Sequence, residues 1–293
     1  MSLTIGTRGS ALALAQTRQF AAELERAAGV ETRLQIISTR GDRIQDRPLV
    51  AIGGKGLFTL ELEEALRSGE IQLAVHSLKD LPTDDPAGLV IGCVPRRASP
   101  WDVLIGHRLA ELPKRAVIGT GSLRRRVQLL AARPDLVIRD IRGNVDTRLR
   151  KLREQPFDAI VLARAGMQRV GLDLGDTAHE DLDPAVCLPA PAQGALGIQC
   201  RGDDTATLAA LAHVACAETT TCVTAERAFL ATVEGGCNVP AGAYATVRDG
   251  VLTLEAMLAD DAGRIVRQQV AAHADHAVAL GVSLAEQLRA ALA

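Results

Sequence analysis

The sequence predicts an α/β fold that is followed by a small α+β domain. Over the first 200 residues, short apolar runs alternate with helical patterns, and the last third instead has three strands in succession before a final helix. Alternation of this kind indicates parallel sheets covered by helices. The 293 residues, 47% of them hydrophobic and 23% charged, are typical of a globular chain with a sizeable core and two or three domains.

Each expected element follows from local pattern. Ser10 is the expected N-cap of a helix that reaches Ala28, and Gly69 closes a second helix. In the first 200 residues we expect strands at 3–7, 34–38, 71–75, 89–94, 103–105, 116–119, 136–141 and 159–162, and helices at 11–28, 59–67, 122–132 and 144–153. Beyond them we expect helices at 203–215, 220–233 and 277–292, and strands at 241–248, 251–258 and 265–271.

Charge is distributed unevenly along a chain whose net charge is −2. Residues 114–153 hold 12 basic and 3 acidic side chains, a surplus of +9, so the remainder carries −11. Such a segment is either a solvated helix face or one wall of a cleft for a polyanionic ligand. The near-neutral total and only six aromatic residues argue against a nucleic-acid partner.

The six cysteines show neither a CxxC pair nor a zinc-ligand spacing. We therefore expect free thiols in a cytoplasmic protein, and no metal site. The chain has no run of about 18 apolar residues, so we expect no membrane span. The N-terminal segment does not resemble a targeting signal, because its apolar run is short and acidic residues follow it.

Gly119-Thr-Gly121-Ser122-Leu-Arg124 follows an expected strand and opens an expected helix. It is close to a dinucleotide fingerprint, but Arg124 stands where the third glycine is needed, which weakens an NAD interpretation. A capped helix N-terminus with arginines is an anion site, although a solvated basic turn stays possible. Successive helical residues diverge by about 100°, so Arg124, Arg125 and Arg126 cannot all face one pocket, and we expect two of them to face inward and one outward.

A second strand-to-helix junction, Arg142–Arg148, lies in the same basic segment, with Asn144 as its expected N-cap. Two such junctions favour a ligand with several carboxylates or phosphates. The glycine-rich stretch around Lys55 does not match a phosphate-binding loop, because position 49 is leucine and position 56 is glycine. We interpret it as a mobile lid that carries a lysine.

Two further segments carry reactive side chains. His76-Ser77-Leu78-Lys79-Asp80 lies at the carboxyl end of an apolar strand, where open α/β sheets bind ligands; we expect His76 itself to be structural. Cys237 lies on a loop between Gly-Gly and a proline, which makes a reactive thiol as plausible as a buried one. A Cys–His hydrolase is poorly supported, because no histidine base is near in sequence.

Taken together, these segments resemble the porphobilinogen deaminase (hydroxymethylbilane synthase) family nearly from end to end. The matching stretches are Thr7–Ser10 with Leu12–Leu14 and Gln16, Thr39–Asp42, Gly53–Phe58, His76–Asp80, Gly119–Arg125, Arg142–Arg148, Gln193–Ala195 and Glu234–Cys237. Each stretch alone is weak evidence, but their order and spacing are specific. One departure is Ala51, where some members carry a basic residue, and it affects only a secondary lid contact.

The resemblance implies two lobes like those of periplasmic binding proteins, with mostly parallel sheets, and a small α+β C-terminal domain. The first lobe would comprise 1–97 and 191–215, the second 98–190, and the last domain 216–293. The implied reaction deaminates porphobilinogen and condenses four molecules, by new C–C bonds, onto a dipyrromethane cofactor held by a thioether at Cys237. Water then releases hydroxymethylbilane.

The resemblance also implies a role for each motif residue. Asp80 would stabilise cationic intermediates and shuttle a proton, with Lys79 beside it, and Lys55 and Phe58 would belong to a lid. The implied cofactor contacts are Cys237, Ser10, Ser77, Lys79, Asp80, Thr120, Ser122, Arg124, Arg125, Arg142, Gly143 and Asn144. The implied substrate contacts are Arg8, Gln16, Arg142, Arg148, Arg169 and Gln193.

The partner expected from the resemblance is porphobilinogen, with no nucleic acid and no membrane, and we expect a monomer in the cytoplasm. Two other functions stay open on the residues alone. One is a two-lobed anion-binding protein without chemistry, and the other is the NAD enzyme weakened by Arg124.

Overall fold

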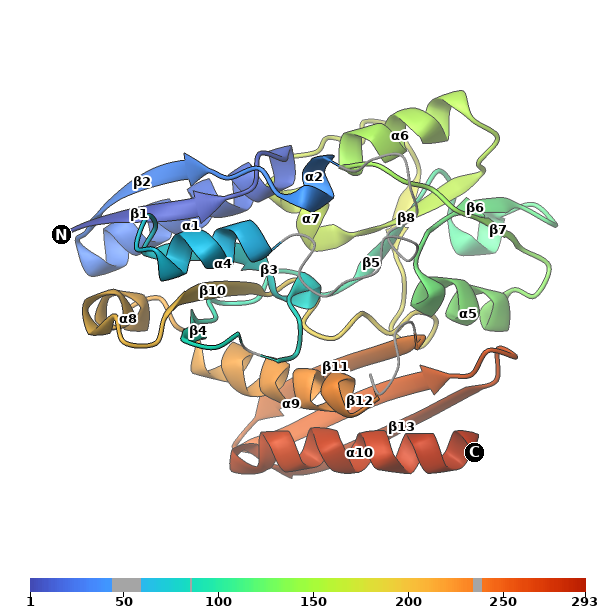
Figure 1. The fold of residues 1–293 in the computed structure, drawn as a ribbon. Helices are drawn as coiled ribbons and strands as arrows, with labels where there is room; N and C mark the ends of the chain where they lie inside the picture. Colours follow the sequence, from blue (N-terminus) through green and yellow to red (C-terminus); the bar gives the residue numbers. More distant parts are fainter. Residues whose placement is uncertain (44–58, 85, 234–238) are drawn as a thin grey trace. The chain divides into compact units, whose positions relative to one another are not determined.

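The computed structural model describes residues 1–43, 59–84, 86–233 and 239–293 (Figure 1). It divides into two compact units, each made of two stretches of chain: Met1–Arg97 with Ala195–Thr220, and Ala98–Gly194 with Thr221–Ala293. Lys55, Phe58 and Cys237 lie outside the described residues, so the predictions for them stay predictions. The division into three domains also stays a prediction.

The first unit is built on a five-stranded sheet with the order β2-β1-β3-β10-β4. The strands are β1 (Ser2–Thr7), β2 (Glu31–Ile36), β3 (Leu73–Ser77), β4 (Leu89–Cys93) and β10 (Leu196–Arg201). In this sheet, β1 pairs in parallel with β2 and β3, whereas β10 pairs antiparallel with β3 and β4. The chain therefore returns to its first sheet after residue 195, as the resemblance implies.

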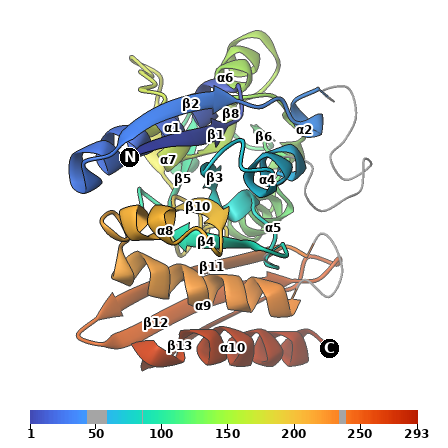
Figure 2. The same cartoon turned by 60° about the vertical axis from the view of Figure 1, so that its left-hand side comes forward.

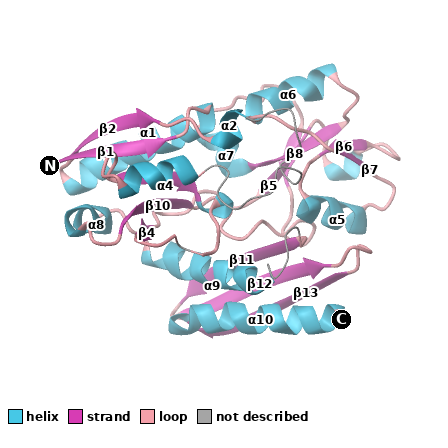
Figure 3. Cartoon of the chain, in the orientation of Figure 1, coloured by secondary structure: helices cyan, strands magenta, loops and turns pink. Residues whose placement is uncertain are grey.

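Helices cover both faces of this sheet. Apolar residues of α1 (Ala11–Ala28) and α8 (Thr205–Ala212) pack with β1, β3 and β10 in one buried cluster. On the other face, α4 (Leu60–Arg67) packs against β3 in a second cluster. Figure 3 shows α1 and α4 beside the strands of this unit. Ser10 caps α1 as predicted, because its hydroxyl accepts a hydrogen bond from Ala13 N at 3.3 Å.

The second unit contains a sheet with the order β7-β6-β8-β5-β9. Its strands are β5 (Asp102–Ile105), β6 (Val117–Gly119), β7 (Val137–Arg139), β8 (Ala159–Ala163) and β9 (His179–Asp181). One face packs against α5 (Leu123–Ala132). The other packs against α6 (Val145–Glu154) and α7 (Arg164–Arg169).

Both of these sheets are mixed, which corrects the expectation of mostly parallel sheets. In the described part of the chain, each sheet has two parallel and two antiparallel pairings. In the first sheet the antiparallel pairings are those of β10, which returns after a long excursion, and in the second sheet they are those of β5, the strand with which that sheet begins. Alternation of strands and helices along the chain does not reveal these pairings.

The second unit also holds an antiparallel sheet of β11 (Ala241–Arg248), β12 (Val251–Ala259) and β13 (Ile265–His273). Side chains of α9 (Ala217–Val233) and α10 (Ala277–Leu292) join β11 and β12 in one buried cluster. Figure 2 shows the two helices beside this sheet. The predicted succession of three strands before a final helix is confirmed.

Short elements complete the described chain. They are α2 (Arg40–Arg43) and the 3₁₀ turns η1 (Leu78–Asp80), η2 (Leu109–Glu111) and η3 (Ala274–His276). No single described helix is long and apolar enough to cross a membrane. Taken together, α8 and α9 would be long and apolar enough by length and composition alone, but the two helices are bent by 111° at the break between them. The described residues contain no cluster of three or more potential metal ligands of the His, Cys, Asp or Glu type.

Candidate active site

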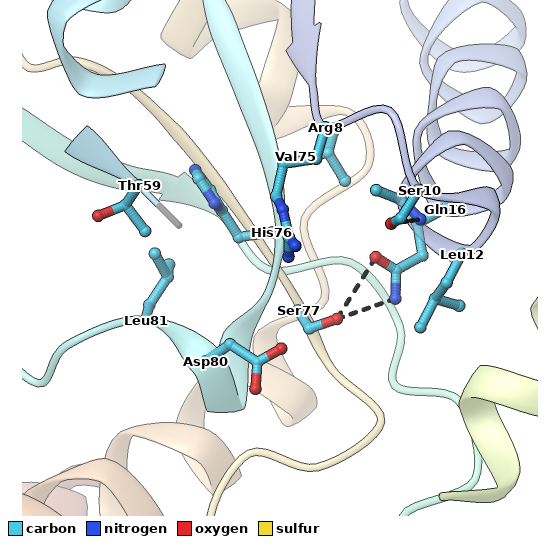
Figure 4. A pocket seen from close by; sticks show the side chains of 11 residues that line it. Arg8, Ser10, Leu12, Gln16, Thr59, Val75, His76, Ser77, Asp80 and Leu81 are labelled. Carbon is cyan, nitrogen blue, oxygen red and sulfur yellow. Dashed lines mark hydrogen bonds between the residues drawn. The ribbon is translucent and has the colours of Figure 1, made fainter. Parts of the chain in front are cut away.

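The first unit contains a pocket at the carboxyl ends of β1 and β3, beside the first turn of α1 (Figure 4). Several residues predicted for the site line it: Arg8, Ser10, Gln16, Ser77 and Asp80. Parallel β1 and β3 end at the same edge of the sheet, so the two motifs far apart in sequence meet there.

Gln16 and Ser77 are tied together in this pocket. The Gln16 amide Nε2 donates to Ser77 Oγ at 2.9 Å, and Gln16 is only 4% exposed. Figure 4 shows this pair on one wall of the pocket, with the Asp80 side chain in the same pocket. The hydrogen bond fixes the Ser77 hydroxyl, because the buried amide has little freedom to reorient. Gln16 therefore holds the wall in shape as much as it offers a contact to substrate.

Asp80 is the exposed acidic group of the pocket. It ends the 3₁₀ turn η1 directly after β3, and Lys79 beside it is half-buried. A turn at the end of a central strand presents a carboxylate on a rigid support. The half-buried guanidinium of Arg8 lies near enough to His76 to act on its titration. The pocket thus combines a carboxylate with a cation.

His76 is a buried residue of the pocket lining, and its imidazole stays neutral. Burial lowers the pKa of the imidazole, a hydrogen bond with the Gln199 side chain raises it, and the positive charge of Arg8 lowers it; the net result is a pKa of about 4. A buried neutral ring agrees with the expected structural role.

The first junction of the basic segment lies in the second unit, at the N-terminus of α5. Ser122 caps this helix, since its hydroxyl accepts a hydrogen bond from Arg125 N at 3.5 Å. Thr120 is buried, and its hydroxyl accepts a hydrogen bond from Ser122 N at 3.2 Å. Arg124 and Arg125 are each 6% exposed and Arg126 is exposed, so the predicted split of two inward arginines and one outward arginine is confirmed.

The second junction lies at the N-terminus of α6. Arg142 and Asn144 are exposed, and the side chain of Asn144 makes no capping hydrogen bond, so it occupies the predicted position without the predicted contact. Arg148 Nε donates to Gly143 O at 2.7 Å. Burial, followed by the positive charges of Arg125 and Arg142, lowers the pKa of Arg148. Guanidinium groups from both junctions therefore act on one another in this unit.

Arg169 and Gln193 are held by protein groups. Arg169 at the end of α7 donates through Nη2 to Gly194 O at 2.7 Å, and burial lowers its pKa to about 10. Gln193 is 1% exposed, and its amide donates to Pro100 O at 2.6 Å and to Asp102 Oδ1 at 2.9 Å. This burial corrects the expectation that Gln193 offers its amide to substrate, because its described hydrogen bonds are made within the protein.

Among the described residues, two carboxylates with no exposed surface were not predicted from the sequence. Asp102 at the start of β5 is 0% exposed, and its carboxylate forms ion pairs with both Arg124 and Arg125. Glu226 on α9 is also 0% exposed, and it accepts hydrogen bonds from Ala192 N at 2.6 Å and Ala245 N at 2.9 Å. Asp102 could have been found from the sequence, since it is an acidic residue directly before the apolar residues of a predicted strand. A buried acid at such a position needs a positively charged or hydrogen-bonding partner.

Comparison with known proteins identifies the family. The model described as "Porphobilinogen deaminase, dipyromethane cofactor binding domain" matches residues 3–209, and that of the "Porphobilinogen deaminase, C-terminal domain" matches residues 220–290. A relative from Roseiflexus castenholzii, named porphobilinogen deaminase, is 50% identical over 98% of this chain and 95% of its own. One of the same name from Syntrophotalea carbinolica is 48% identical over 99% of this chain and 93% of its own.

Among solved structures, a probable amino-acid ABC transporter extracellular-binding protein from Bacillus subtilis covers 73% of this chain and 90% of its own, with 9% identity and a TM-score of 0.43. Assignment of the family therefore rests on sequence. Both family models and nearly full-length relatives agree, and the chain belongs to the porphobilinogen deaminase family.

Proposed function

We propose that this chain deaminates porphobilinogen and joins four molecules head to tail in tetrapyrrole biosynthesis, with Asp80 as its catalytic carboxylate. Family membership supports the reaction and the dipyrromethane cofactor. The assignment of Asp80 as the catalytic carboxylate rests on one observation: Asp80, Arg8 and Ser77 line the same pocket at the carboxyl ends of β1 and β3.

The residues of the second unit fit an acidic cofactor. Arg125 Nε is buried and has no hydrogen-bond partner among the described residues. Arg148 is acted on by two other arginines, and no acid contributes to the shift in its pKa. Each pyrrole ring brings two carboxylates, and planar guanidinium groups bind carboxylates well. Among the described residues, Arg124 and Arg125 share one carboxylate and no ion pair involves Arg148, so this unit keeps positive charge that such a polyanion would neutralise.

When bound, the dipyrromethane would supply the free pyrrole α-carbon for the first new C–C bond, and the terminal ring of the growing chain would supply it for each later bond. We propose Cys237 as the thioether attachment of this cofactor. The chain's own side chains would hold its carboxylates: Ser122, Arg125, Arg142 and Arg148 at the two helix N-termini, with Ser10 and Ser77 in the pocket of the first unit. Arg124 and Thr120, whose described contacts are internal, would support this surface from below.

Asp80 would accept hydrogen bonds from pyrrole N–H groups and offset the positive charge that develops when ammonia leaves. An exposed carboxylate on a short turn can also take up the proton that is lost when the new bond is formed. Arg8 lies in the same pocket and would bind a ring carboxylate, which orients the ring toward Asp80. Lys79 and Arg169 would add charge, and Lys55 and Phe58 would belong to the lid.

The test compares Asp80→Asn with the matched control Asp84→Asn, an exposed carboxylate four residues further on that does not line the pocket. We expect Asp80→Asn to fold normally and to release ammonia from porphobilinogen at least about 10²-fold more slowly, because the charge at the reacting ring is lost. Asp84→Asn should match the wild type. A wild-type rate in Asp80→Asn would remove Asp80 from the mechanism.

Ammonia release also separates this proposal from an anion-binding protein without chemistry, which would bind porphobilinogen and leave it unchanged. We further propose that the enzyme acts as a monomer in the cytoplasm. Sedimentation of the purified chain tests the first of these statements, because a dimer would have twice the 30.9 kDa mass.

A further inference from the structure

Asp102 is a buried acid for which the proposed reaction gives no direct use. It is the first residue of β5, and none of its surface is exposed. Its carboxylate Oδ2 lies 2.8 Å from Arg124 Nη1, and Oδ1 lies 2.6 Å from Arg125 Nη2. One carboxylate at the N-terminal end of β5 therefore contacts two consecutive arginines at the start of α5.

The same carboxylate is held in place by two neutral donors and stays ionised. Gln193 Nε2 donates to Asp102 Oδ1 at 2.9 Å, and the Cys187 thiol donates to Oδ2 at 3.4 Å. Burial opposes ionisation, but the charges and hydrogen bonds of the two arginines outweigh it and keep the pKa of Asp102 far below its usual range. The acid thus carries a full negative charge in the interior.

Both arginines are also fixed at a second point. Arg124 Nη1 donates to Leu188 O at 2.6 Å, and Arg125 Nη1 donates to Val161 O at 2.9 Å. Each guanidinium is therefore held between a backbone carbonyl and the carboxylate. Such a double restraint fixes the plane of the group, because guanidinium donors form a rigid fork.

The charges in this cluster do not cancel. Two guanidinium groups share one carboxylate, and the nearby Cys187 thiol stays neutral because burial raises its pKa to about 11. One positive charge remains in excess, and its field reaches Arg148 on α6. A second acid would have made the cluster neutral, whereas no acid would have left two like charges in contact.

We propose that Asp102 is a positioning residue for the family reaction: it orients the Arg124–Arg125 pair and, by neutralising only one of the two, leaves a fixed positive charge for ring carboxylates. The inference rests on the proposed function, since it assigns a use to those arginines. Asp102 itself would touch neither substrate nor cofactor.

The test is Asp102→Asn in the full chain, with Asp158→Asn as the matched control. Asp158 directly precedes the buried strand β8 of the same unit, and its carboxylate accepts a hydrogen bond from Val117 N at 2.6 Å. Among the described hydrogen bonds and ion pairs, Asp158 contacts no arginine. For each purified chain we would measure thermal unfolding, the mass of any covalent adduct, and kcat and KM for porphobilinogen.

We expect KM to rise at least tenfold in Asp102→Asn, while Asp158→Asn keeps the wild-type KM even if its unfolding temperature falls. The direction of the change in KM is informative, because Asp102→Asn raises the excess positive charge of the Arg124–Arg125 pair from one to two. If charge alone mattered, KM for an acidic substrate would fall. A fall in KM, or an unchanged KM in folded and adduct-bearing Asp102→Asn, would overturn the proposal; a folded chain that lacks the adduct would support it.

Gln193→Ala keeps the proposal testable if Asp102→Asn does not fold. It removes one neutral donor from Asp102 and leaves every charge in place, so we expect a smaller rise in KM, about threefold, with kcat little changed. An unchanged KM in this variant, after Asp102→Asn has failed to fold, would assign Asp102 to stability alone. A wild-type chain that releases no ammonia would instead contradict the proposed function.

Discussion

The arginines of the second unit differ in how far protein groups neutralise them. Arg124 contacts the Asp102 carboxylate and a backbone carbonyl, and Arg126 is exposed to solvent. Within the described part of the chain, the hydrogen bond of the Arg148 side chain is made to a carbonyl, that of Gly143. Unneutralised positive charge is costly in a folded protein, and it is retained where a ligand of opposite charge offsets it. Residues of one type thus divide into paired, partly paired and solvated positions, and the proposed binding role falls on the partly paired ones.

His76 makes stability depend on pH. Its pKa is about 4 in the folded chain and 6.5 in a model compound, so below pH 6.5 the unfolded chain takes up a proton that the folded chain refuses. Stability from this group is full above pH 6.5 and is lost as pH falls toward 4. Between pH 7 and pH 5 we expect a loss of about 2 kcal/mol.

Denaturant unfolding at the two pH values measures this loss, with His76→Gln as the comparison. The variant lacks the titrating ring, so its free energy of unfolding should change by about 2 kcal/mol less over the same interval. Equal pH dependence in both chains would show that His76 is protonated in the folded state.

At the scale of single elements, α5 joins stability to binding through its cap. Ser122→Ala removes the acceptor for Arg125 N, and we expect the free energy of unfolding to fall by about 1 kcal/mol. Ser122→Asp keeps an equally good cap, so stability should be retained, but the new negative charge should raise KM for an acidic substrate. Chemical denaturation and steady-state kinetics separate the two effects. A wild-type KM in Ser122→Asp would place Ser122 outside the site.

The packing of α10 on α9 depends on Gly281. A Cβ at this position would meet the carbonyl oxygen of Ala225 and would lie 2.8 Å from Phe229 N. We expect Gly281→Ala to destabilise the chain by about 1–3 kcal/mol by overpacking, although alanine favours helix. The control Ser283→Ala, exposed on the same helix, should change stability by less than about 0.5 kcal/mol. A gain in stability from Gly281→Ala would mean that the helices can separate at little cost.

Sequence patterns predict the elements well where apolar runs are continuous. The strands expected at 103–105 and 159–162 are confirmed as β5 and β8. In contrast, β9 reads His-Glu-Asp and has no apolar signal, because it pairs at the edge of its sheet. The return of β10 to the first sheet could be expected only from the family resemblance, since pairing between distant segments is not encoded by local period.

The site shows the same division. Helical geometry predicted that two of the three arginines on α5 turn inward and one outward, because it depends on neighbouring residues alone, but it did not identify which one. It could not reveal that Asp102 lies between two of them or that Gln193 supports that acid, since these contacts join positions more than 20 residues apart. Burial of Gln193 likewise depends on tertiary packing and not on its own motif.

At the scale of the whole molecule, one chain is proposed both to hold an acidic oligomer and to form its bonds. The family model that matches residues 3–209 is named for the dipyrromethane cofactor, and this range contains Asp80 and both arginine junctions. Cys237, the proposed attachment, follows α9 and precedes β11. A thiol needs no histidine partner to react with a strongly electrophilic cation, since its thiolate is a good nucleophile.

The most direct test of this account is the intact mass of the purified chain, compared with that of Cys237→Ser. We predict that the wild type carries the mass of one dipyrromethane group in excess of its sequence mass, localised to the peptide containing Cys237, and that Cys237→Ser shows no excess and no turnover. A fully active wild-type chain of unmodified mass would contradict the account.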